Sequence, residues 1–450
     1  MQTRTRITLG LVVAILCLTI GVAAGWRYYN PAADQAGAEH LRLFREVVTI
    51  VRNSYVEEVG GKKLLEGAIN GMLASLDPHS SYLPPEPFTE MKTEISGSFG
   101  GLGIEISMRD SKLTVVAPIE DTPAWRAGIQ SGDHIWKIDD TPTRGLTITQ
   151  AVKRMRGEAG TQVSLSVLRQ GNGKPLVFPL VRDIIKTRSL KSRTLEPGYG
   201  YVRISQFQER TGDDFVAALA KLRSENGGSL KGLVLDLRNN PGGLLDAAVA
   251  VAGRFVGERL DNGLIVYTEG REHFAKRSYS ATIGEKEPRY PVVVLINGGS
   301  ASASEIVAGA LQDHGRAVIM GTTSFGKGSV QTVVPLKDGA GLKLTTARYY
   351  TPKGRSIQAR GIEPDIVVER AEFKELPDKG GAGFLEKDLD NHLSGAETDN
   401  GEKTPGPDAT KAPAAPATPE HEADRDYQLR RALELLKGWD AMRKVAAAKR

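Results

Sequence analysis

A buried strand that turns through two glycines into a helix constrains this chain more than any other stretch. Residues 291–296 are apolar throughout, and Gly298 and Gly299 follow almost at once. Apolar side chains then recur at helical spacing, at Ile306, Val307, Ala310 and Leu311. A helix that starts here has free backbone N–H groups and the positive end of its dipole beside small side chains. Because this environment favours developing negative charge, a serine in the turn is a candidate nucleophile.

Three serines lie in this stretch, and the local sequence does not say which of them would act. Ser300, Ser302 and Ser304 alternate with alanines. Ser302 and Glu305 also have the spacing of a capping box, in which two side chains bond the free N–H groups at the start of a helix. The stretch alone therefore fits a catalytic role and a purely structural one.

A serine nucleophile needs a base that takes its proton, and the chain offers two kinds. His314 is twelve positions after Ser302, which is about 18 Å along a helix, so His314 is out of reach. His273, in a polar and charged stretch, is an alternative without further support. Lys327 lies between two glycines after an apolar strand, and it can act as a base if Phe325 and neighbouring strands bury it and lower its pKa.

The region from 97 to 183 changes to short predicted strands and one helix at 147–155. It carries two signatures, Gly101-Leu102-Gly103-Ile104 and Pro123-Ala124-x-x-Ala127-Gly128-Ile129-x-x-Gly132-Asp133. Together they resemble a PDZ domain, whose first loop captures a C-terminal carboxylate with successive backbone N–H groups while the peptide adds a strand. The resemblance implies a peptide-binding site that comprises Gly101, Leu102, Gly103, Ile104, Ile148 and Val152.

Strands and helices alternate after residue 198, which is typical of an α/β core. A buried strand at 232–237 leads through the turn at 238–243 into a helix at 244–256. The serine stretch repeats this strand–turn–helix order, so the predicted core uses the same scheme twice.

With these motifs in one chain, residues 40 to 370 resemble the carboxyl-terminal processing proteases, also called tail-specific proteases. The matching motifs are Ser300-Ala301-Ser302-Ala303-Ser304-Glu305, Phe325-Gly326-Lys327-Gly328-x-x-Gln331 and Asp236-Leu237-Arg238-x-Asn240-x-Gly242-Gly243. The resemblance implies a crotonase- or ClpP-like α/β protease core with an inserted, mostly β PDZ domain. It also implies the site residues: Ser302 as nucleophile, Lys327 as base, Gln331 as the group that orients the lysine, and backbone N–H groups of Ala303 and of Gly242 or Gly243 for the oxyanion.

The spacing of Lys327 and Gln331 gives this assignment a structural test. Four residues apart on a strand, their Cα atoms would be about 13 Å from each other and the two could not serve one serine. On a helical turn they would be neighbours. If the trio acts together, residues 327–331 should be helical or sharply bent.

The resemblance implies an exported serine endopeptidase that recognises protein C-terminal tails and uses neither a cofactor nor a metal. A non-catalytic PDZ scaffold on a protease-like core is the alternative, which the joint presence of Ser302, Lys327 and Gln331 disfavours. An adaptor or activator protein and a homo-oligomer are further candidate partners. Arg156, directly after the PDZ helix, is a candidate regulatory contact with the core, although a surface arginine also fits that position.

The N-terminal residues predict export. Residues 7–26 are uncharged and mostly apolar, they follow Arg4 and Arg6, and such a stretch of about 20 residues crosses a bilayer. Because residues 22–24 resemble a signal-peptidase site, residues 1–26 are either a cleaved signal or a membrane anchor. In both cases the bulk of the chain is exported, and a bacterial periplasm, free or at the inner membrane, fits best. The one cysteine, Cys17, lies in this segment, so the exported part has no thiol chemistry.

Composition completes the expected organisation. The formal charge of +5, from 59 basic and 54 acidic residues, comes without a basic block that interleaves aromatic residues, so nucleic acid is not implied. A flexible linker is predicted where Gly, Ala, Pro and acidic residues dominate, and the helix after it docks on its own core or contacts another subunit. The expected parts are a signal or anchor at 1–26, a helical segment at 38–96, the PDZ domain at 97–183, the protease core at 184–370, the linker at 371–424 and a helix at 425–450.

Overall fold

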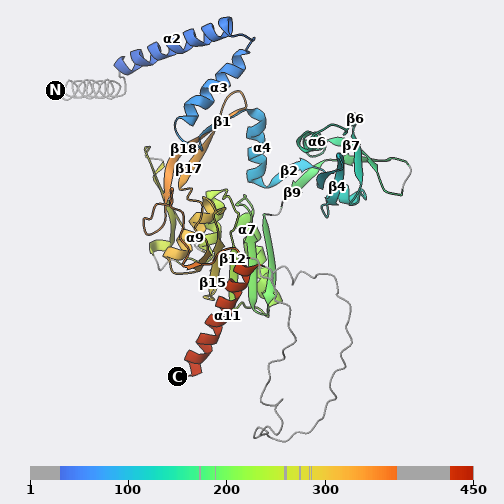
Figure 1. Ribbon diagram of the computed structural model, residues 1–450. Helices are drawn as coiled ribbons and strands as arrows, with labels where there is room; N and C mark the ends of the chain where they lie inside the picture. The colour runs from blue at the N-terminus through green and yellow to red at the C-terminus, as the bar shows by residue number, and fades with distance from the viewer. Residues whose placement is uncertain are drawn as a thin grey trace, which may run out of the picture. The chain divides into compact units, whose positions relative to one another are not determined.

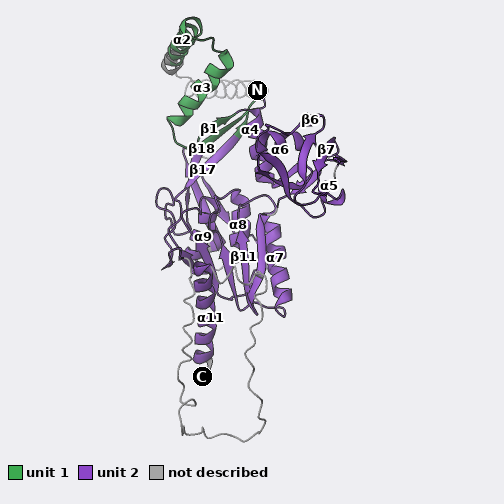
Figure 2. Ribbon diagram, turned by 45° about the vertical axis from the view of Figure 1, so that its right-hand side comes forward, with its two compact units in different colours: residues 1–83, 334–336, 340–344 green, residues 84–333, 337–339, 345–450 purple. Residues whose placement is uncertain are grey.

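The computed structural model describes residues 31–448, apart from 172–173, 188, 258–260, 273–274, 283, 285 and 372–425 (Figure 1). The chain divides into two compact units, which Figure 2 colours separately. The predicted signal or anchor at 1–26, and the predicted linker from residue 372 on, lie outside the described residues. None of the helices in the described part is long and apolar enough to span a membrane.

The first unit is an N-terminal helical segment with a short strand. Its elements are α2 (Pro31–Ser54), α3 (Gly61–Ala74) and β1 (Ser81–Leu83). β1 pairs antiparallel with residues 341–343, at the start of β18 (Gly341–Tyr350). Leu73, Tyr82 and Ala340 form a small core, whereas other apolar side chains such as Leu41 and Met72 are more than half exposed.

The second unit begins with α4 (Pro85–Ser96) and contains the segment that resembles a PDZ domain. Its main sheet has the strand order β3-β4-β5-β7-β8, with β6 paired to β5, around a separate apolar core. Strands β2 and β9, at the two ends of the segment, pair antiparallel. The elements are β2 (Ser98–Gly101), β3 (Ile104–Arg109), β4 (Lys112–Pro118), α5 (Pro123–Arg126), β5 (His134–Ile138), β6 (Thr141–Pro142), α6 (Ile148–Met155), β7 (Gln162–Leu168), β8 (Leu176–Val181) and β9 (Asp183–Lys186).

The rest of the second unit is built on a six-stranded sheet with the order β10-β11-β12-β15-β16-β19. Only β10 runs antiparallel to its neighbour, so the mixed α/β architecture predicted for the core is confirmed. The sheet strands are β10 (Leu190–Glu196), β11 (Tyr199–Ile204), β12 (Gly232–Asp236), β15 (Val292–Ile296), β16 (Val318–Gly321) and β19 (Ile366–Val367). The remaining elements are α7 (Thr211–Glu225), α8 (Leu245–Gly253), the 3₁₀ turn η1 (Asp261–Gly263), β13 (Leu264–Gly270), β14 (Arg277–Ser280), α9 (Ala303–Asp313), β17 (Ser329–Pro335), β18 and α11 (Tyr427–Ala448).

Helices cover both faces of this sheet, as Figure 1 shows for α7, α9 and α11. Leu233 and Leu235 of β12 belong to the core under α7, α8 and α9. Val234 belongs to the opposite core, where α11 packs its residues Leu429 and Leu436. Successive residues of a strand point to opposite faces, so both faces of β12 are apolar because both are covered. The C-terminal helix therefore docks on its own core, which is one of the two predicted roles, and the contact with another subunit stays a prediction.

Candidate active site

Ser302 is the residue immediately before α9, in the turn that follows β15. We call residues 297–302 the serine turn. The Ser302 backbone has φ 53° and ψ −110°, which residues other than glycine rarely adopt, and only 7% of the residue is exposed. Strained backbone of this kind persists where neighbouring contacts hold it, and it is frequent at functional sites. The hydroxyl therefore lies at the N-terminal, electropositive end of a buried helix.

The two neighbouring serines have structural roles. The Ser300 hydroxyl donates to the carbonyl of Leu237 (2.8 Å), and the Ser304 hydroxyl donates to the carbonyl of Asn240 (2.9 Å). Both residues are completely buried. Both hydroxyl groups thus bond the backbone of residues 237–240, after β12. Because these two serines are engaged in this way, Ser302 is favoured as the reactive one of the three.

Glu305 joins the serine turn to the segment that carries Lys327. The carboxylate is completely buried, and its Oε2 accepts the backbone N–H groups of Ser302 (2.7 Å) and Lys327 (2.9 Å). Its Oε1 accepts the N–H of Gly326 (2.7 Å) and the hydroxyl of Ser324 (2.6 Å). Four donors around one buried carboxylate satisfy its acceptor capacity without a basic side chain. The sequence shows Glu305 as a capping residue, but its bonds to residues 324–327 are visible only in the fold.

Lys327 is partly buried, whereas Phe325, two positions before it, is 61% exposed. The N–H of Phe325 donates to the carbonyl of Ser300, and the next two N–H groups donate to Glu305. These backbone contacts fix residues 325–327 against the core. That Phe325 contributes to the burial of the lysine stays a prediction.

Tyr349 of β18 is a neighbour of Ser302 that the sequence did not reveal. It is 6% exposed, and burial raises the pKa of its phenol to about 12, although a hydrogen bond with Ser302 acts in the lowering direction. Its N–H donates to the carbonyl of Gly328 (2.7 Å), beside Lys327. No local pattern marks such a residue, because it reaches the site from a strand more than forty positions downstream.

The turn after β12, which we call the glycine turn (residues 238–243), lies directly against Ser302. Gly242 has φ 104°, and a Cβ atom placed on it would be 2.9 Å from the Ser302 Cβ and 2.8 Å from the Ala301 carbonyl oxygen. The Gly242 N–H donates to Asn240 Oδ1 (2.9 Å). Because that donor is engaged, the Gly242 N–H is not free to bind another acceptor at this position.

Gln331 lies on a strand and not on a helical turn. β17 begins at Ser329, two residues after Lys327, and the Gln331 amide nitrogen donates to Ser329 Oγ (3.0 Å) and Thr345 Oγ1 (3.3 Å). Val330 and the β-branched residues after Gln331 favour a strand, and pairing with β18 enforces it. Of the two geometries expected at 327–331, the helical one is wrong from residue 329 on, and the bent one stays a prediction for residues 327–328, which precede the strand.

The remaining candidate residues are accounted for as follows. His314 Nε2 bonds the carbonyl of Leu264 (2.7 Å) at the end of α9, and His273 lies outside the described residues. The described residues contain no cluster of three or more His, Cys, Asp or Glu side chains that would hold a metal. In the PDZ-like segment, Leu102 is buried and Gly103 has φ 73° against Thr122, whereas Ile148 on α6 is 41% exposed. Arg156 lies over the ring of Phe99 in β2 (4.2 Å).

Comparisons with known proteins match successive parts of the chain. Residues 198–368 match peptidase family S41, and residues 100–178 match the PDZ domain. Residues 27–86 match the N-terminal domain of the activating protease CtpB. The first two matches fall on the predicted protease core and the predicted PDZ domain. The third falls on the N-terminal helical segment, which precedes both.

Curated relatives extend over most of the chain. The carboxy-terminal-processing protease of Bartonella bacilliformis is 49% identical over 82% of this chain and 84% of its own length. The carboxy-terminal processing protease CtpB of Bacillus subtilis is 37% identical over 76% of this chain and 71% of its own. Among solved structures, the photosystem II D1 C-terminal processing protease is 33% identical and covers 73% of this chain and 92% of its own, with a TM-score of 0.41.

Proposed function

Because the chain belongs to the carboxy-terminal processing proteases of peptidase family S41, we propose that its reaction uses Ser302 as nucleophile and Lys327 as general base. One observation carries this assignment: a single buried oxygen, Glu305 Oε2, accepts N–H groups from both residues. Both backbone N–H groups therefore lie within hydrogen-bond distance of one atom, although the two residues are 25 positions apart (327 − 302). Two N–H groups that share one acceptor atom are close enough in space for the lysine side chain to span the distance between the two residues.

The proposed cycle follows from these positions. Neutral Lys327 takes the Ser302 proton while Oγ attacks the carbonyl carbon of a peptide bond. The oxyanion is bound by the N–H groups of Ala303 and Gly243, which contribute about 3 kcal/mol each. The Gly242 N–H could replace that of Gly243 only after its hydrogen bond to Asn240 Oδ1 breaks. The lysine ammonium then protonates the leaving amine as the C–N bond breaks. Water attacks the acyl-enzyme, Lys327 takes the water's proton and returns it to Ser302 Oγ.

Gln331 is proposed to orient Lys327. Its amide oxygen is the atom that would accept a hydrogen bond from the lysine ammonium, while its amide nitrogen is held by Ser329 and Thr345. Because β17 places Gln331 on an extended segment, we propose that it assists the lysine less directly than an adjacent residue on a helix would. A smaller loss of activity is therefore expected on replacing Gln331 than on replacing Lys327.

The PDZ-like segment is proposed to bind the C-terminal tail of a protein substrate. Its loop Gly101–Ile104 would take the carboxylate, and the exposed Ile148 with Val152 on α6 would contact apolar side chains of the tail. Binding energy remote from Ser302 would then support the chemical step. Arg156 is proposed to influence activity through Phe99 in β2, which pairs with β9 where the chain leaves the segment.

Export and assembly are also proposed. The apolar residues 7–26 after Arg4 and Arg6 favour translocation to a periplasm, with an anchor if the segment is not cleaved. Exposed apolar side chains on α2 and α3 favour a further partner, which would be a second copy of the chain or an activator protein. Light scattering of the full chain, with and without substitutions of these side chains, would distinguish the two.

The decisive experiment compares wild type with Ser302→Ala and Lys327→Ala, using the full chain in detergent and an unfolded protein with an apolar C-terminus. Ser224→Ala and Lys337→Ala are matched controls, because both residues are exposed. We expect cleavage to be lost in the first pair and kept in the second, with all four variants folded. Full activity in Lys327→Ala would eliminate the lysine as base, and full activity in Ser302→Ala would eliminate the whole assignment.

A further inference from the structure

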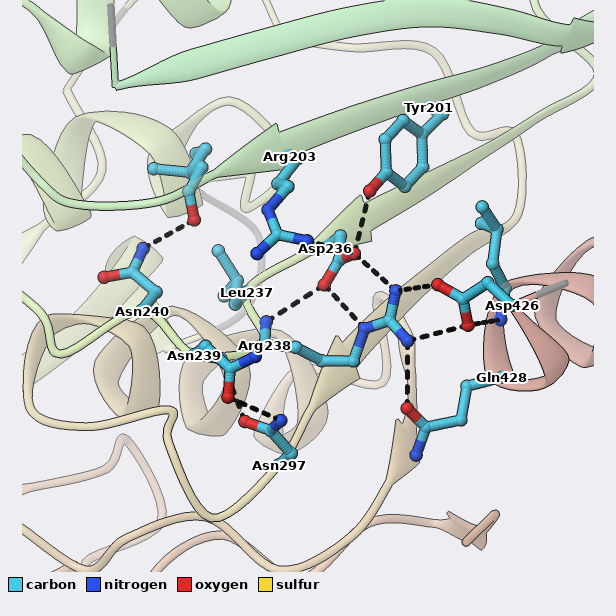
Figure 3. A network of polar contacts seen from close by, with 12 residues as sticks. Tyr201, Arg203, Asp236, Leu237, Arg238, Asn239, Asn240, Asn297, Asp426 and Gln428 are labelled. Carbon is cyan, nitrogen blue, oxygen red and sulfur yellow. Dashed lines mark hydrogen bonds and ion pairs between the residues drawn. The ribbon is translucent and has the colours of Figure 1, made fainter. Parts of the chain in front are cut away.

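Arg238, the first residue of the glycine turn, uses every hydrogen-bond donor of its guanidinium (Figure 3). Nε and Nη2 donate to the two carboxylate oxygens of Asp236 (2.9 and 2.6 Å). Nη1 and Nη2 donate to those of Asp426 (2.9 and 2.6 Å), and Nη1 also donates to Gln428 Oε1 (2.9 Å). A guanidinium has five N–H bonds, so two carboxylates and one amide satisfy it completely.

This network is buried and charged. Asp236 is inaccessible to solvent, Arg238 is 8% exposed, and Asp236 also accepts the hydroxyl of Tyr201 (2.8 Å). Burial acts to lower the pKa of Arg238, but its bonds with the two aspartates outweigh burial and raise it. Desolvation offsets much of the energy of such ion pairs, so they are a weak explanation for stability and a better one for precise geometry.

Two of the three acceptors come from the far end of the chain. Asp426 and Gln428 are 188 and 190 positions from Arg238; Asp426 immediately precedes α11, and Gln428 is the second residue of that helix. Asp426 Oδ1 also accepts the N–H of Leu429 (3.1 Å), and the Gln428 amide donates to the carbonyl of Val368 (2.7 Å). The acceptors are therefore fixed themselves, by the first turn of α11 and by the end of β19.

Arg238 leads into the residues that touch the serine turn. Asn239 has φ 55°, and its N–H and side chain bond the amide of Asn297 (2.9 and 3.0 Å). The carbonyl of Asn240 accepts the N–H of Ala301 (2.9 Å). Gly242 then passes within contact of Ser302. A displacement of Arg238 would thus be transmitted, over five residues, to the N–H groups proposed to bind the oxyanion.

A cavity of about 1390 Å³ lies beside the network. Besides Arg238 and Asn239, its described lining carries the basic residues Lys191, Arg193, Arg203 and Arg370, with Asp426 as the acidic one. Without the Asp426 charge, Arg238 would keep only Asp236 as a carboxylate partner and would be surrounded by several like charges. Its observed position would then be less strongly preferred.

We propose that the start of the C-terminal helix is a positioning element for catalysis: Asp426 and Gln428 hold Arg238, and Arg238 holds the glycine turn. The inference deepens the proposed function and rests on it for the identity of the reaction. Neither Asp426 nor Gln428 contacts the reacting atoms, so their effect is on the geometry of the oxyanion donors.

The test uses the full chain with Asp426→Asn, Gln428→Ala and, as a matched control on the same helix, Asp440→Asn, which removes an ion pair between the partly exposed Asp440 and the exposed Lys444, away from Arg238. On a peptide substrate we expect kcat to fall about 10- to 100-fold in Asp426→Asn while KM changes little, because small displacements of catalytic groups have effects of this size. Gln428→Ala should cause a smaller fall, and Asp440→Asn none. Asp426→Glu should recover part of the loss.

Hydrogen exchange of a peptide covering residues 237–244 gives a readout independent of proteolysis. Exchange should be faster in Asp426→Asn and unchanged in Asp440→Asn. Unchanged exchange in Asp426→Asn, or faster exchange with wild-type kcat, would overturn the inference. Cleavage retained by Ser302→Ala would instead refute the proposed nucleophile, and the exchange result would still decide whether Asp426 holds the turn.

Discussion

The serine turn and the glycine turn meet at Ser302, but the chain holds them in different ways. The serine turn is fixed by Glu305, three residues after Ser302, whose carboxylate accepts hydrogen bonds from uncharged N–H and O–H groups. The glycine turn is fixed at its start by Arg238 and ion pairs that reach α11. One turn therefore depends on a nearby carboxylate, and the other depends on the C-terminal end of the chain.

This difference has a physical basis. A helix N-terminus supplies its own N–H groups, so a single carboxylate at the third helical position can bind the preceding backbone. The glycine turn begins at a strand end, where Asp236 is buried on the face that α11 covers. A buried carboxylate there requires a cation, and that cation requires further acceptors. The serine turn should accordingly depend less on α11 than the glycine turn does.

The largest effect is expected from Glu305→Gln, which tests the serine turn. The amide replaces one acceptor oxygen by a donor that faces two N–H or O–H donors. We expect activity to fall on the order of 100-fold or more and stability to fall by roughly 1–3 kcal/mol, the usual cost of leaving buried donors unsatisfied. Single-turnover acylation and urea unfolding measure the two effects.

The matched control for this change is Glu363→Gln, because Glu363 is exposed. It should leave both quantities unchanged. Wild-type acylation in Glu305→Gln would mean that the shared oxygen does not position Ser302 and Lys327, and the two turns would no longer differ as described.

A second, somewhat smaller effect is expected from Gly242→Ala in the glycine turn. The added methyl would be 2.8 Å from the Ala301 carbonyl oxygen and 2.9 Å from the Ser302 Cβ, so the turn must move away from the nucleophile. We expect kcat to fall about 100-fold with little change in KM. Peptide cleavage under saturating substrate measures this.

Gly228→Ala separates the steric contact from backbone strain. Gly228 has φ 90°, similar to the 104° of Gly242, but open space where its Cβ would lie. It should lower stability without lowering kcat. An equal loss of kcat in both variants would attribute the effect of Gly242→Ala to global strain and not to contact with Ser302.

The smallest effect expected is the pH dependence of stability that the Arg238–Asp426 pair contributes at the start of the glycine turn. Burial acts to raise the pKa of Asp426, but hydrogen bonds and charge from Arg238 and two backbone N–H groups lower it below its usual value. A lowered folded-state pKa stabilises the fold above the unfolded pKa of about 3.9, and this stabilisation is lost as pH falls through the folded pKa.

Melting temperatures measured from roughly pH 6 down to pH 3 check this prediction, in the range where aspartates titrate. Wild type should lose stability more steeply on acidification than Asp426→Asn, which has no carboxylate to protonate. Parallel curves for the two proteins would show that the Arg238–Asp426 pair does not contribute to the pH dependence.

Local patterns in the sequence predicted much of the site. The Gly-Gly turn between β15 and α9, the second turn at 238–243 and the PDZ signatures are all short-range features, and the family assignment that rests on them is confirmed. The helix predicted at 147–155 is present as α6 (Ile148–Met155), whose spacing pattern likewise involves residues within one turn of each other.

Local reasoning fell short where a long-range contact decides the conformation. The helical alternative for residues 327–331 gave way to β17 from Ser329 on, because pairing with β18 decides the conformation of that segment. The backbone contacts of residues 325 and 326 with Ser300 and Glu305 were equally invisible in the local sequence.

By itself, the sequence determined the fold class, the family and the residues from which a serine nucleophile could be chosen, because these depend on periodicity, turn residues and short motifs. Only the tertiary structure decided that Ser300 and Ser304 serve the backbone, that Glu305 joins Ser302 to Lys327, and that α11 reaches Arg238. These are contacts between segments that are distant along the chain. Their hydrogen-bond geometry exists only once the sheet has brought the strand ends together.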